Sequence, residues 1–303
     1  KMAISRAQLA KELEPGLNAL FGLEFGRYEN EHSEIFDEES SDRAFEEEVM
    51  LGGFATAPVK SEGGAISFDD AQETYTARYT HETIALAFSI TEEAIEDNLY
   101  DRLASRYTKA LARSMATTKQ IKAASILNNA FSTGANVIGD GAALCSASHP
   151  SLSGTQTNLL AVAADLNETS LEQMLIDIAG FTDERGLKIA VRGTKLIIPK
   201  ELQFIAERVM NSALRSGTSD NDNNAMKNMG MLPEGAVVNH YLTDTDAYFI
   251  KTDAPNGFKY FNRAAIKTAM EGDFDTGNMR FKARERYSFG VSDWRCVFGT
   301  PGA

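Results

Sequence analysis

The sequence predicts an α+β protein in which one long helix lies beside paired strands. Residues 89–132 contain neither proline nor glycine and are rich in residues that favour helices. Residues 74–90 and 279–289 alternate side-chain character with a period of two, which is typical of strands. Paired glycines at 52–53 and 63–64 mark turns ahead of the first of these strand patterns.

Length, hydropathy and charge exclude several classes of protein. The 303 residues, 43% of them hydrophobic, are enough for one large or two modest globular units. No apolar run approaches the roughly 20 residues of a membrane span, so we expect neither a membrane protein nor a signal peptide. A net charge of −13 argues against nucleic-acid binding over the whole surface, although local basic strips are compatible with it.

The first segment, residues 1–48, is strongly acidic toward its end. Between positions 29 and 48 a single base, Arg43, stands among ten acids: Glu29, Glu31, Glu34, Asp37, Glu38, Glu39, Asp42, Glu46, Glu47 and Glu48. Like charges at this density resist packing into a core, so we interpret the segment as an extended arm. It is either a solvated loop or an arm along a basic surface of a neighbouring subunit.

Residues 49–90 predict a long two-stranded excursion with a glycine-rich tip. Tyr75 and Tyr79 belong to its alternating part, while Phe54, Lys60 and Phe68 fall near the tip. A lone ribbon of this kind is barely stable in water. It therefore needs another surface, either its own domain or a neighbouring subunit.

The predicted long helix begins with a capping box, Ser89-Ile90-Thr91-Glu92. From Arg102 to Lys122 it carries six bases and no acid: Arg102, Arg106, Lys109, Arg113, Lys119 and Lys122. This charge pattern indicates either a solvated helix face or a surface turned toward an acidic neighbour or DNA.

Shorter elements are expected after the long helix. We expect helices at 170–185, ended by Gly186, and at 200–214. Strands are expected at 195–198, which is buried, and at 237–242 and 247–251. The polar stretch 216–230 predicts a mobile loop.

A strand near the end of the chain carries a predicted basic strip. Period-two spacing places four bases on one face: Arg280, Lys282, Arg284 and Arg286. Met279, Phe281, Ala283, Tyr287 and Phe289 take the other, buried face. Glu285 falls on the apolar side, so it needs a partner or marks a strand end. Candidate partners of the strip are a neighbour's acidic arm, which we favour, and DNA.

Catalytic and metal-binding motifs are absent from the sequence, and no cofactor is expected. The nearest cluster is Cys145 with His149, four residues apart, and a hydrolase using this pair is an alternative hypothesis. Zinc needs more ligands than these two. The two cysteines, Cys145 and Cys296, are typical of a reducing compartment, with a single bridge as the alternative. Trp294 is expected to anchor the closing strand in a core.

The order of these parts resembles the major capsid proteins of tailed bacteriophages. Three stretches of the sequence are similar to the Mu-like major head subunit group: 89–97 (SITEEAIED), 144–150 (LCSASHP) and 195–202 (KLIIPKEL). The resemblance implies an N-terminal arm (1–48), an extended loop (49–90), a spine helix with the start of a peripheral domain (91–168), an axial domain (169–245) and closing peripheral strands (246–303).

This resemblance implies a structural, non-enzymatic role in a virion head assembled in the bacterial host cytoplasm. Subunits would form pentamers and hexamers of an icosahedral shell, together with a portal and scaffold or decoration proteins. DNA would contact the inner wall without sequence specificity, and no membrane would be involved. Candidate subunit contacts are Glu46, Glu47, Glu48, Phe54, Lys60, Phe68, Tyr75, Tyr79, Arg280, Lys282, Arg284 and Arg286. A nanocompartment shell of the same fold is an alternative.

Overall fold

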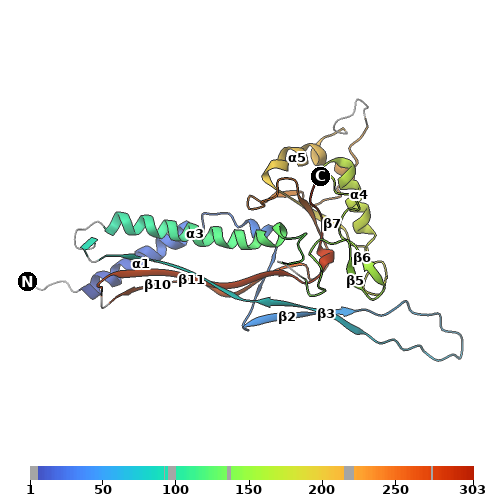
Figure 1. Ribbon diagram of the computed structural model, residues 1–303, viewed down its shortest axis with the longest axis horizontal. Coiled ribbons are helices and arrows are strands. Elements are labelled where there is room, and N and C mark those ends of the chain that lie inside the picture. Colours follow the sequence, from blue (N-terminus) through green and yellow to red (C-terminus); the bar gives the residue numbers. More distant parts are fainter. Residues whose placement is uncertain (1–5, 92, 95–99, 135–137, 215–221, 274–275) are drawn as a thin grey trace, which may run out of the picture.

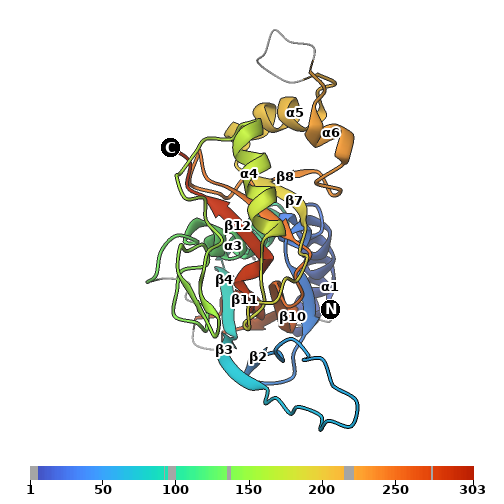
Figure 2. The same cartoon turned by 90° about the vertical axis from the view of Figure 1, so that its right-hand side faces the viewer.

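The computed structural model describes residues 6–91, 93–94, 100–134, 138–214, 222–273 and 276–303. Three parts are visible in Figure 1: an elongated limb, a compact lobe at one end of it, and a long ribbon that projects beyond the lobe. The same arrangement is seen end-on in Figure 2.

The limb is a four-stranded sheet with two helices on one face. The sheet has the order β1-β10-β11-β4, with β1 parallel to β10 and the other pairs antiparallel. Its strands are β1 (Asp37–Ser40), β10 (Phe258–Gly272), β11 (Met279–Val291) and β4 (Glu82–Ile90). The helices are α1 (Arg6–Phe25) and α3 (Tyr100–Asn128), and the short η1 (Glu31–Glu34) lies against α3.

Apolar packing fixes which face of the sheet the helices cover. Leu111 and Met115, one turn apart on α3, are buried in one cluster with Phe281 and Ala283 of β11. Alternation along β11 then turns Arg280, Lys282 and Arg284 to the other side, where they are exposed. The limb sheet therefore has one helix-covered face and one open face.

The compact lobe is built around a second four-stranded sheet of order β12-β9-β7-β8. Its strands are β7 (Gly193–Ile198), β8 (Ala236–Val238), β9 (Tyr248–Thr252) and β12 (Val297–Thr300). Its helices are α4 (Glu168–Ala179), η2 (Lys200–Leu202), α5 (Gln203–Asn211), α6 (Ala225–Met229) and η3 (Trp294–Cys296). β7 and β12 are almost completely buried, Lys195 included, so both of their faces are covered by other parts of the chain.

The long ribbon, residues 45–80, pairs β2 (Phe45–Gly52) with β3 (Gln72–Thr80). Residues 53–71 join the two strands and carry no regular structure. A small hairpin of β5 (His149–Ser151) and β6 (Gly154–Gln156) lies beside the lobe.

Several expected boundaries are wrong at the start of the long helix. The two-stranded excursion, expected to reach residue 90, ends at Thr80. The residues after it form β4, which pairs with β11 of the limb sheet as far as Ile90, opposite Met279. Ser89 is therefore a strand residue and not a helix cap. Thr91 accepts a hydrogen bond from the Ala94 amide instead, at 3.4 Å. Residues 92 and 95–99, on which the rest of that prediction fell, lie outside the described part of the chain.

Other boundaries also differ. The helix expected at 170–185 ends at Ala179, and Gly186 lies in a later turn with φ +85°. The helix expected at 200–214 is the 3-10 turn η2 followed by α5, which ends at Asn211. Within the stretch expected to be a loop, Ala225–Met229 forms α6, while 215–221 lies outside the described residues.

The acidic segment is not an extended arm over its described length. Residues 31–52 form η1, β1 and β2 against their own chain, and Ile35 and Phe36 are buried in the core. The acids stay near water while lysines of the chain contact them. Lys195 pairs with Glu34 at 2.9 Å, and Lys251 pairs with Asp37 at 3.6 Å.

Candidate assembly surfaces

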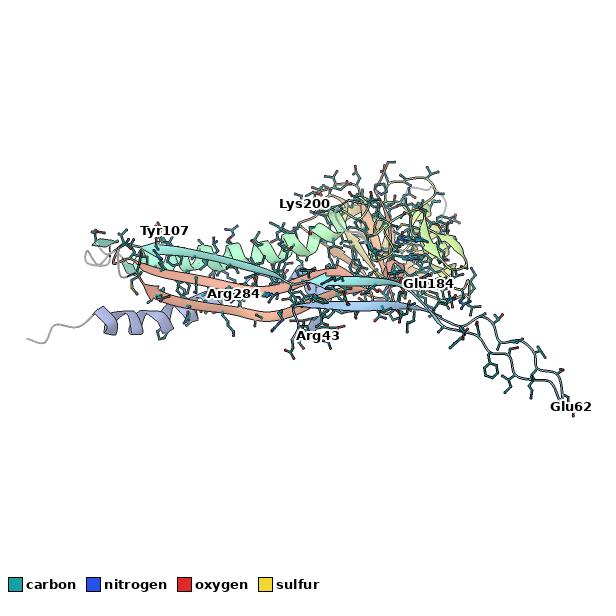
Figure 3. The ribbon with its side chains drawn as sticks, turned by 60° about the horizontal axis from the view of Figure 1, so that its bottom comes forward. Arg43, Glu62, Tyr107, Glu184, Lys200 and Arg284 are labelled. Atoms are coloured by element: carbon teal, nitrogen blue, oxygen red, sulfur yellow. The ribbon has the colours of Figure 1, made fainter. Side chains whose placement is uncertain are left out.

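The tip of the long ribbon exposes large apolar side chains. Phe68 is 96% exposed, Val59 99%, Ile66 70% and Phe54 59%. Figure 3 shows this tip, labelled at Glu62, reaching far past the lobe. Contiguous apolar exposure of this kind marks an interaction site in a soluble protein.

The root of the ribbon is fastened to the open face of the limb sheet. The ring of Tyr79 lies over Gly290, where a Cβ atom would collide with it, and packs edge-on against Phe261 at 4.8 Å between centroids. Its hydroxyl forms a hydrogen bond with Ser292. Tyr79 is buried against its own chain, and a contact with a neighbouring subunit at this residue stays a prediction.

Buried charge strengthens the same root. Lys259 of β10 donates to Glu48 of β2 and forms an ion pair with Glu39 of β1 at 3.1 Å. Burial alone would lower the pKa of Lys259, but the hydrogen bonds that it donates to Glu48 and Glu39, with the negative charges of those carboxylates, outweigh burial and raise that pKa. The ammonium group therefore ties three strands together. Ser292 adds a further hydrogen bond to Glu48.

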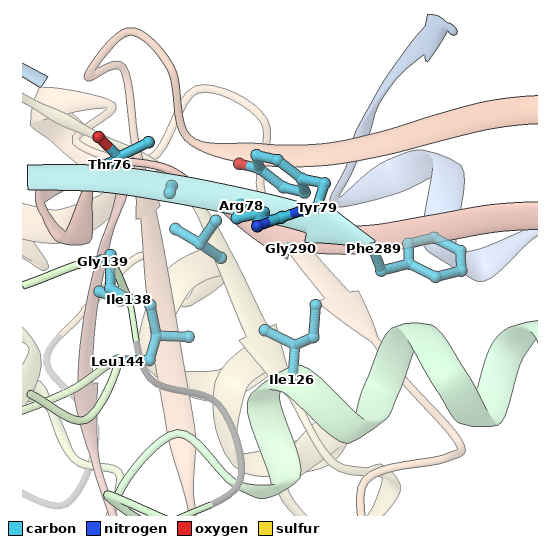
Figure 4. A pocket seen from close by; sticks show the side chains of 11 residues that line it. Thr76, Arg78, Tyr79, Ile126, Ile138, Gly139, Leu144, Phe289 and Gly290 are labelled. Carbon is cyan, nitrogen blue, oxygen red and sulfur yellow. The ribbon is translucent and has the colours of Figure 1, made fainter. Parts of the chain in front are cut away.

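A cavity of about 350 Å³ lies between β3, β11 and the end of α3 (Figure 4). Arg78 and Tyr79 line it from the ribbon, Ile126 from α3 and Phe289 from β11. Gly139 also lines the cavity. Its backbone approaches the carbonyl group of Thr76 so closely that a Cβ atom at this position would collide with it. The residues that line the cavity include no cluster of polar groups that points to catalysis.

His81 sits at the junction between the ribbon and β4. Its Nε2 lies 2.9 Å from the Ser41 hydroxyl, and its Nδ1 lies 2.9 Å from the Ser288 hydroxyl. Ser41 donates to Glu46, so the neutral ring donates from Nε2 and accepts at Nδ1. Burial, with the nearby Arg286, lowers the pKa of His81.

The predicted basic strip lies on the open face of the limb sheet. Lys282 and Arg284 form no ion pair within the described part of the chain, whereas Arg280 pairs with Asp273 at 2.5 Å. Arg286 is half-buried, and its Nε has no hydrogen-bond partner. On the β4 side the strip pairs with small residues: Thr83, Ala85, Ala87 and Ser89. On the β10 side Arg280 pairs with Glu271, and Arg284 pairs with Lys267, a further base.

Glu285, the acid on the expected apolar face of β11, is buried on the side of the sheet that the helices cover. Lys119 of α3 reaches it at 2.7 Å. Burial raises the pKa of Glu285, and the Lys119 ammonium opposes that rise. The expectation that this acid needs a partner is confirmed, and the partner comes from the long helix.

The three acids expected at subunit contacts have partners inside the chain. Glu46 accepts from Ser41 at 2.6 Å, Glu47 lies 3.6 Å from Arg78, and Glu48 binds Lys259. Tyr75 is half-buried, and its hydroxyl oxygen is buried without a partner. Phe54, Lys60 and Phe68 are exposed at the tip.

A further contact, which the sequence did not indicate, joins the tip to the lobe. Arg185 donates to the carbonyl group of Asp70 at 2.8 Å and lies 3.9 Å from the Asp69 carboxylate. Asp69 also accepts from the Ala55 amide at 2.7 Å across the tip. The direction of the ribbon is therefore set partly by the lobe of the same chain.

Cys145 and His149 do not form a nucleophile and base. The His149 ring is buried and lies 2.7 Å from Asp140 and 3.0 Å from Asn158, so both nitrogens are engaged. It stacks on Trp294 at 4.5 Å. Burial raises the pKa of the Cys145 thiol, so a thiolate is disfavoured. These side chains act in packing, and Trp294 is fully buried, as expected.

Across the described ranges, no helix combines the length and apolar character that crossing a bilayer requires. Among the same residues, no three His, Cys, Asp or Glu side chains gather in a group that could hold a metal ion. The two cysteines are free and buried.

Comparison with solved structures gives the same architecture in viral and virus-like particles. A chain from Mycobacterium phage Adephagia is 12% identical, with 100% of this chain and 99% of that one covered and a TM-score of 0.53. The virus-like particle from Pyrococcus furiosus is 9% identical over 94% and 97%, with a TM-score of 0.52. The procapsid of bacteriophage JBD30 is 14% identical over 98% and 76%, also with 0.52. At these identities the likeness shows the fold.

Comparison with curated protein sequences gives no match. A family model described as phage capsid protein matches residues 74–299, from β3 to β12. The match covers the compact lobe and most of the limb, apart from α1, η1 and β1, and the expected α+β tailed-phage capsid fold is confirmed. The chain therefore belongs to the phage capsid protein family, as a structural major capsid protein.

Proposed function

We propose that the chain assembles as pentamers and hexamers into a closed icosahedral head around phage DNA, with each long ribbon lying on an adjacent subunit. The observation that carries this proposal is the exposed apolar tip of the ribbon. Within the described part of the chain, Phe68 is left almost fully exposed and Phe54 more than half exposed. A two-stranded ribbon of this length is marginal alone, and docking on a second copy supplies the missing burial.

Charge supports the open face of the limb sheet as the receiving surface. The long ribbon has seven acids (Glu46, Glu47, Glu48, Glu62, Asp69, Asp70, Glu73) against two bases (Lys60, Arg78). The basic strip, from Arg280 to Arg286, is its electrostatic complement. The chain's own ribbon covers the adjacent part of this face at Ser288 and Gly290. The strip itself is left open to a neighbour.

Other parts of the proposal follow the family. The compact lobe, with the expected axial domain 169–245, would surround the symmetry axis, and residues 91–168 and 246–303 would form most of the periphery. A portal, a scaffold or decoration proteins, and assembly in the host cytoplasm belong to the proposal, as does the Mu-like grouping. The nanocompartment alternative shares the fold, but the match to a phage capsid family favours a phage head.

Electron microscopy of the expressed chain tests the proposal. We expect closed shells of uniform size from the unchanged chain. Replacing Phe54 and Phe68 with Ser should abolish shells and leave the subunit folded, because both side chains are exposed. A matched control is Val162→Ser, which removes a side chain that is 79% exposed outside the ribbon. Normal shells from the double variant would show that the tip does not hold subunits together.

A further inference from the structure

Three bases of α3 form a strip that no other group in the described chain neutralises. Arg106, Lys109 and Arg113 are spaced i, i+3 and i+7, so they share one helix face, and all three are exposed. The opposite face of the helix is buried against the limb sheet through Leu111 and Met115. Within the described residues, none of the three bases forms an ion pair.

The lack of pairing sets this strip apart from the rest of the helix. Farther along α3, Lys119 pairs with Glu285 and Lys122 pairs with Glu82. A solvated helix face normally mixes both signs of charge. Here the sequence from 102 to 122 has no acid, in a chain whose net charge is −13. The result is a local positive field on an otherwise acidic protein.

The two basic strips lie on opposite sides of the limb. The strip from Arg280 to Arg286 shares its face with Ser288 and Gly290, which contact His81 and Tyr79 at the ribbon root. The α3 strip lies on the far side of the sheet from the ribbon (Figures 1 and 3). If the limb lies flat in a shell wall, one strip faces the enclosed space and the other does not.

The position of the ribbon indicates which side of the limb faces the contents of the shell. Under the proposed function, on which this inference rests, the ribbon reaches a neighbour on the open-face side of the sheet. That side is therefore covered by acidic protein, and the α3 side is left for the contents of the shell. A polyanion held inside the shell is the partner that suits an unpaired basic strip.

We propose that Arg106, Lys109 and Arg113 bind the phosphate backbone of enclosed double-stranded DNA without reading its sequence. The three side chains span about 10 Å along the helix axis. Double-stranded DNA carries one phosphate charge per about 1.7 Å of its axis, so a strip of this length lies beside several phosphates. Each subunit contributes a weak, salt-screened contact, and the repeating wall multiplies it. Contacts of this kind let DNA slide and leave the head.

Lysine labelling of virion heads tests which side faces DNA, with a matched control in the same chain. DNA-filled heads and heads emptied of DNA are treated with a small acetylating reagent, and modification of Lys109 and Lys282 is measured by mass spectrometry. We expect Lys109 to become severalfold more reactive when DNA leaves, and Lys282 to stay unchanged. Equal reactivity of Lys109 in both heads, or a rise at Lys282 instead, would overturn the inference.

Substitutions separate this inference from the proposed function. Heads of an Arg106→Gln, Lys109→Gln, Arg113→Gln variant should close in normal number, with fewer reaching full DNA content. The control variant Arg280→Gln, Lys282→Gln, Arg284→Gln should instead reduce the number of closed heads. Normal filling of the α3 variant would contradict DNA binding. Loss of closed heads from a folded α3 variant would assign the strip to a neighbouring subunit and also reject the inference. Absence of shells from the unchanged chain would reject the proposed function itself.

Discussion

The compact lobe and the long ribbon bury their apolar side chains in opposite ways. β7, β9 and β12 of the lobe are almost entirely buried within the chain. β2 alternates exposed and half-buried residues, and the tip leaves Phe68 almost fully exposed. The lobe is therefore stabilised by its own packing. The ribbon is held to its own chain at the root, through Tyr79 and Lys259, and by the contact of Arg185 with Asp69 and Asp70.

This difference separates the residues that stabilise the folded subunit from the residues that act in assembly. Side chains of the lobe affect whether a subunit folds, because cavities in a packed core are costly. Side chains of the ribbon tip have little effect on an isolated subunit, because they contact water. They should act only when a second copy is present. Four predictions test this separation, in order of decreasing effect.

The largest effect is expected for Trp294→Ala in the lobe. Trp294 is fully buried and stacks on His149, so its removal should lower the free energy of unfolding by about 3–5 kcal/mol. Phe68→Ala, the matched aromatic truncation in the ribbon, should change it by less than about 0.5 kcal/mol. Denaturant unfolding of the two subunits measures both values. Similar losses in the two variants would contradict the separation.

The second prediction concerns amide exchange in the ribbon. Amides of residues 53–71 should exchange rapidly in free subunits, because that segment has no regular backbone pairing. In shells their exchange should slow by about tenfold or more, equivalent to about 1.4 kcal/mol. β4 is the internal control, since it pairs with β11 and should exchange slowly in both states. Equal protection of the tip in both states would remove the case for docking.

The ribbon was predictable because its signals are local. Paired glycines mark its turns, and exposed residues such as Phe68 follow from a ribbon too thin to have a core. The alternation along β11 was predictable for the same reason. It placed Arg280, Lys282 and Arg284 on one face, and the structure has that face open.

Features that depend on distant residues could not be predicted. β10 was missed although it has 15 residues, because register shifts between Asn262 and Lys267 interrupt the period of two. The acidic segment was interpreted as an arm because its partners, among them Lys195 and Lys259, come from far along the chain. The link from Arg185 to the ribbon has no local signal either.

A third and smaller effect is expected for charge reversal on the open sheet face. Exposed ion pairs are each worth about 0–1 kcal/mol, so Arg280→Glu with Arg284→Glu should act mainly through the repeating lattice. We expect the subunit concentration needed for shells to rise, and more strongly at low salt, where screening is weaker. Light scattering across a salt series measures it. Adding Glu62→Lys and Glu73→Lys on the ribbon should restore assembly; failure of rescue at every salt concentration would reject the ribbon as the partner of the strip.

The smallest effect is expected from His81, at the boundary between ribbon and limb. The groups that face its ring are Ser41, Ser288 and the charged Glu46, Arg286 and Arg263. Burial and the two arginines lower the pKa of His81, so the folded chain binds fewer protons there than the unfolded chain does. Stability contributed by the neutral ring is therefore present above about pH 6.5 and is lost as the pH falls through that value toward the lowered pKa of the folded state.

His81→Gln keeps a donor and an acceptor for the two serines but cannot titrate. Thermal unfolding between pH 5 and pH 8 should show a smaller loss of stability on acidification in this variant than in the unchanged chain. Some dependence should remain, because burial also lowers the pKa of His32 beneath α3. Superimposable pH profiles would show that the ribbon root does not sense protonation. If the variant loses less stability at low pH while amide exchange of the tip is unchanged, the effect of His81 lies in the limb. The limb, and not the tip, would then be the part that responds to protonation of His81.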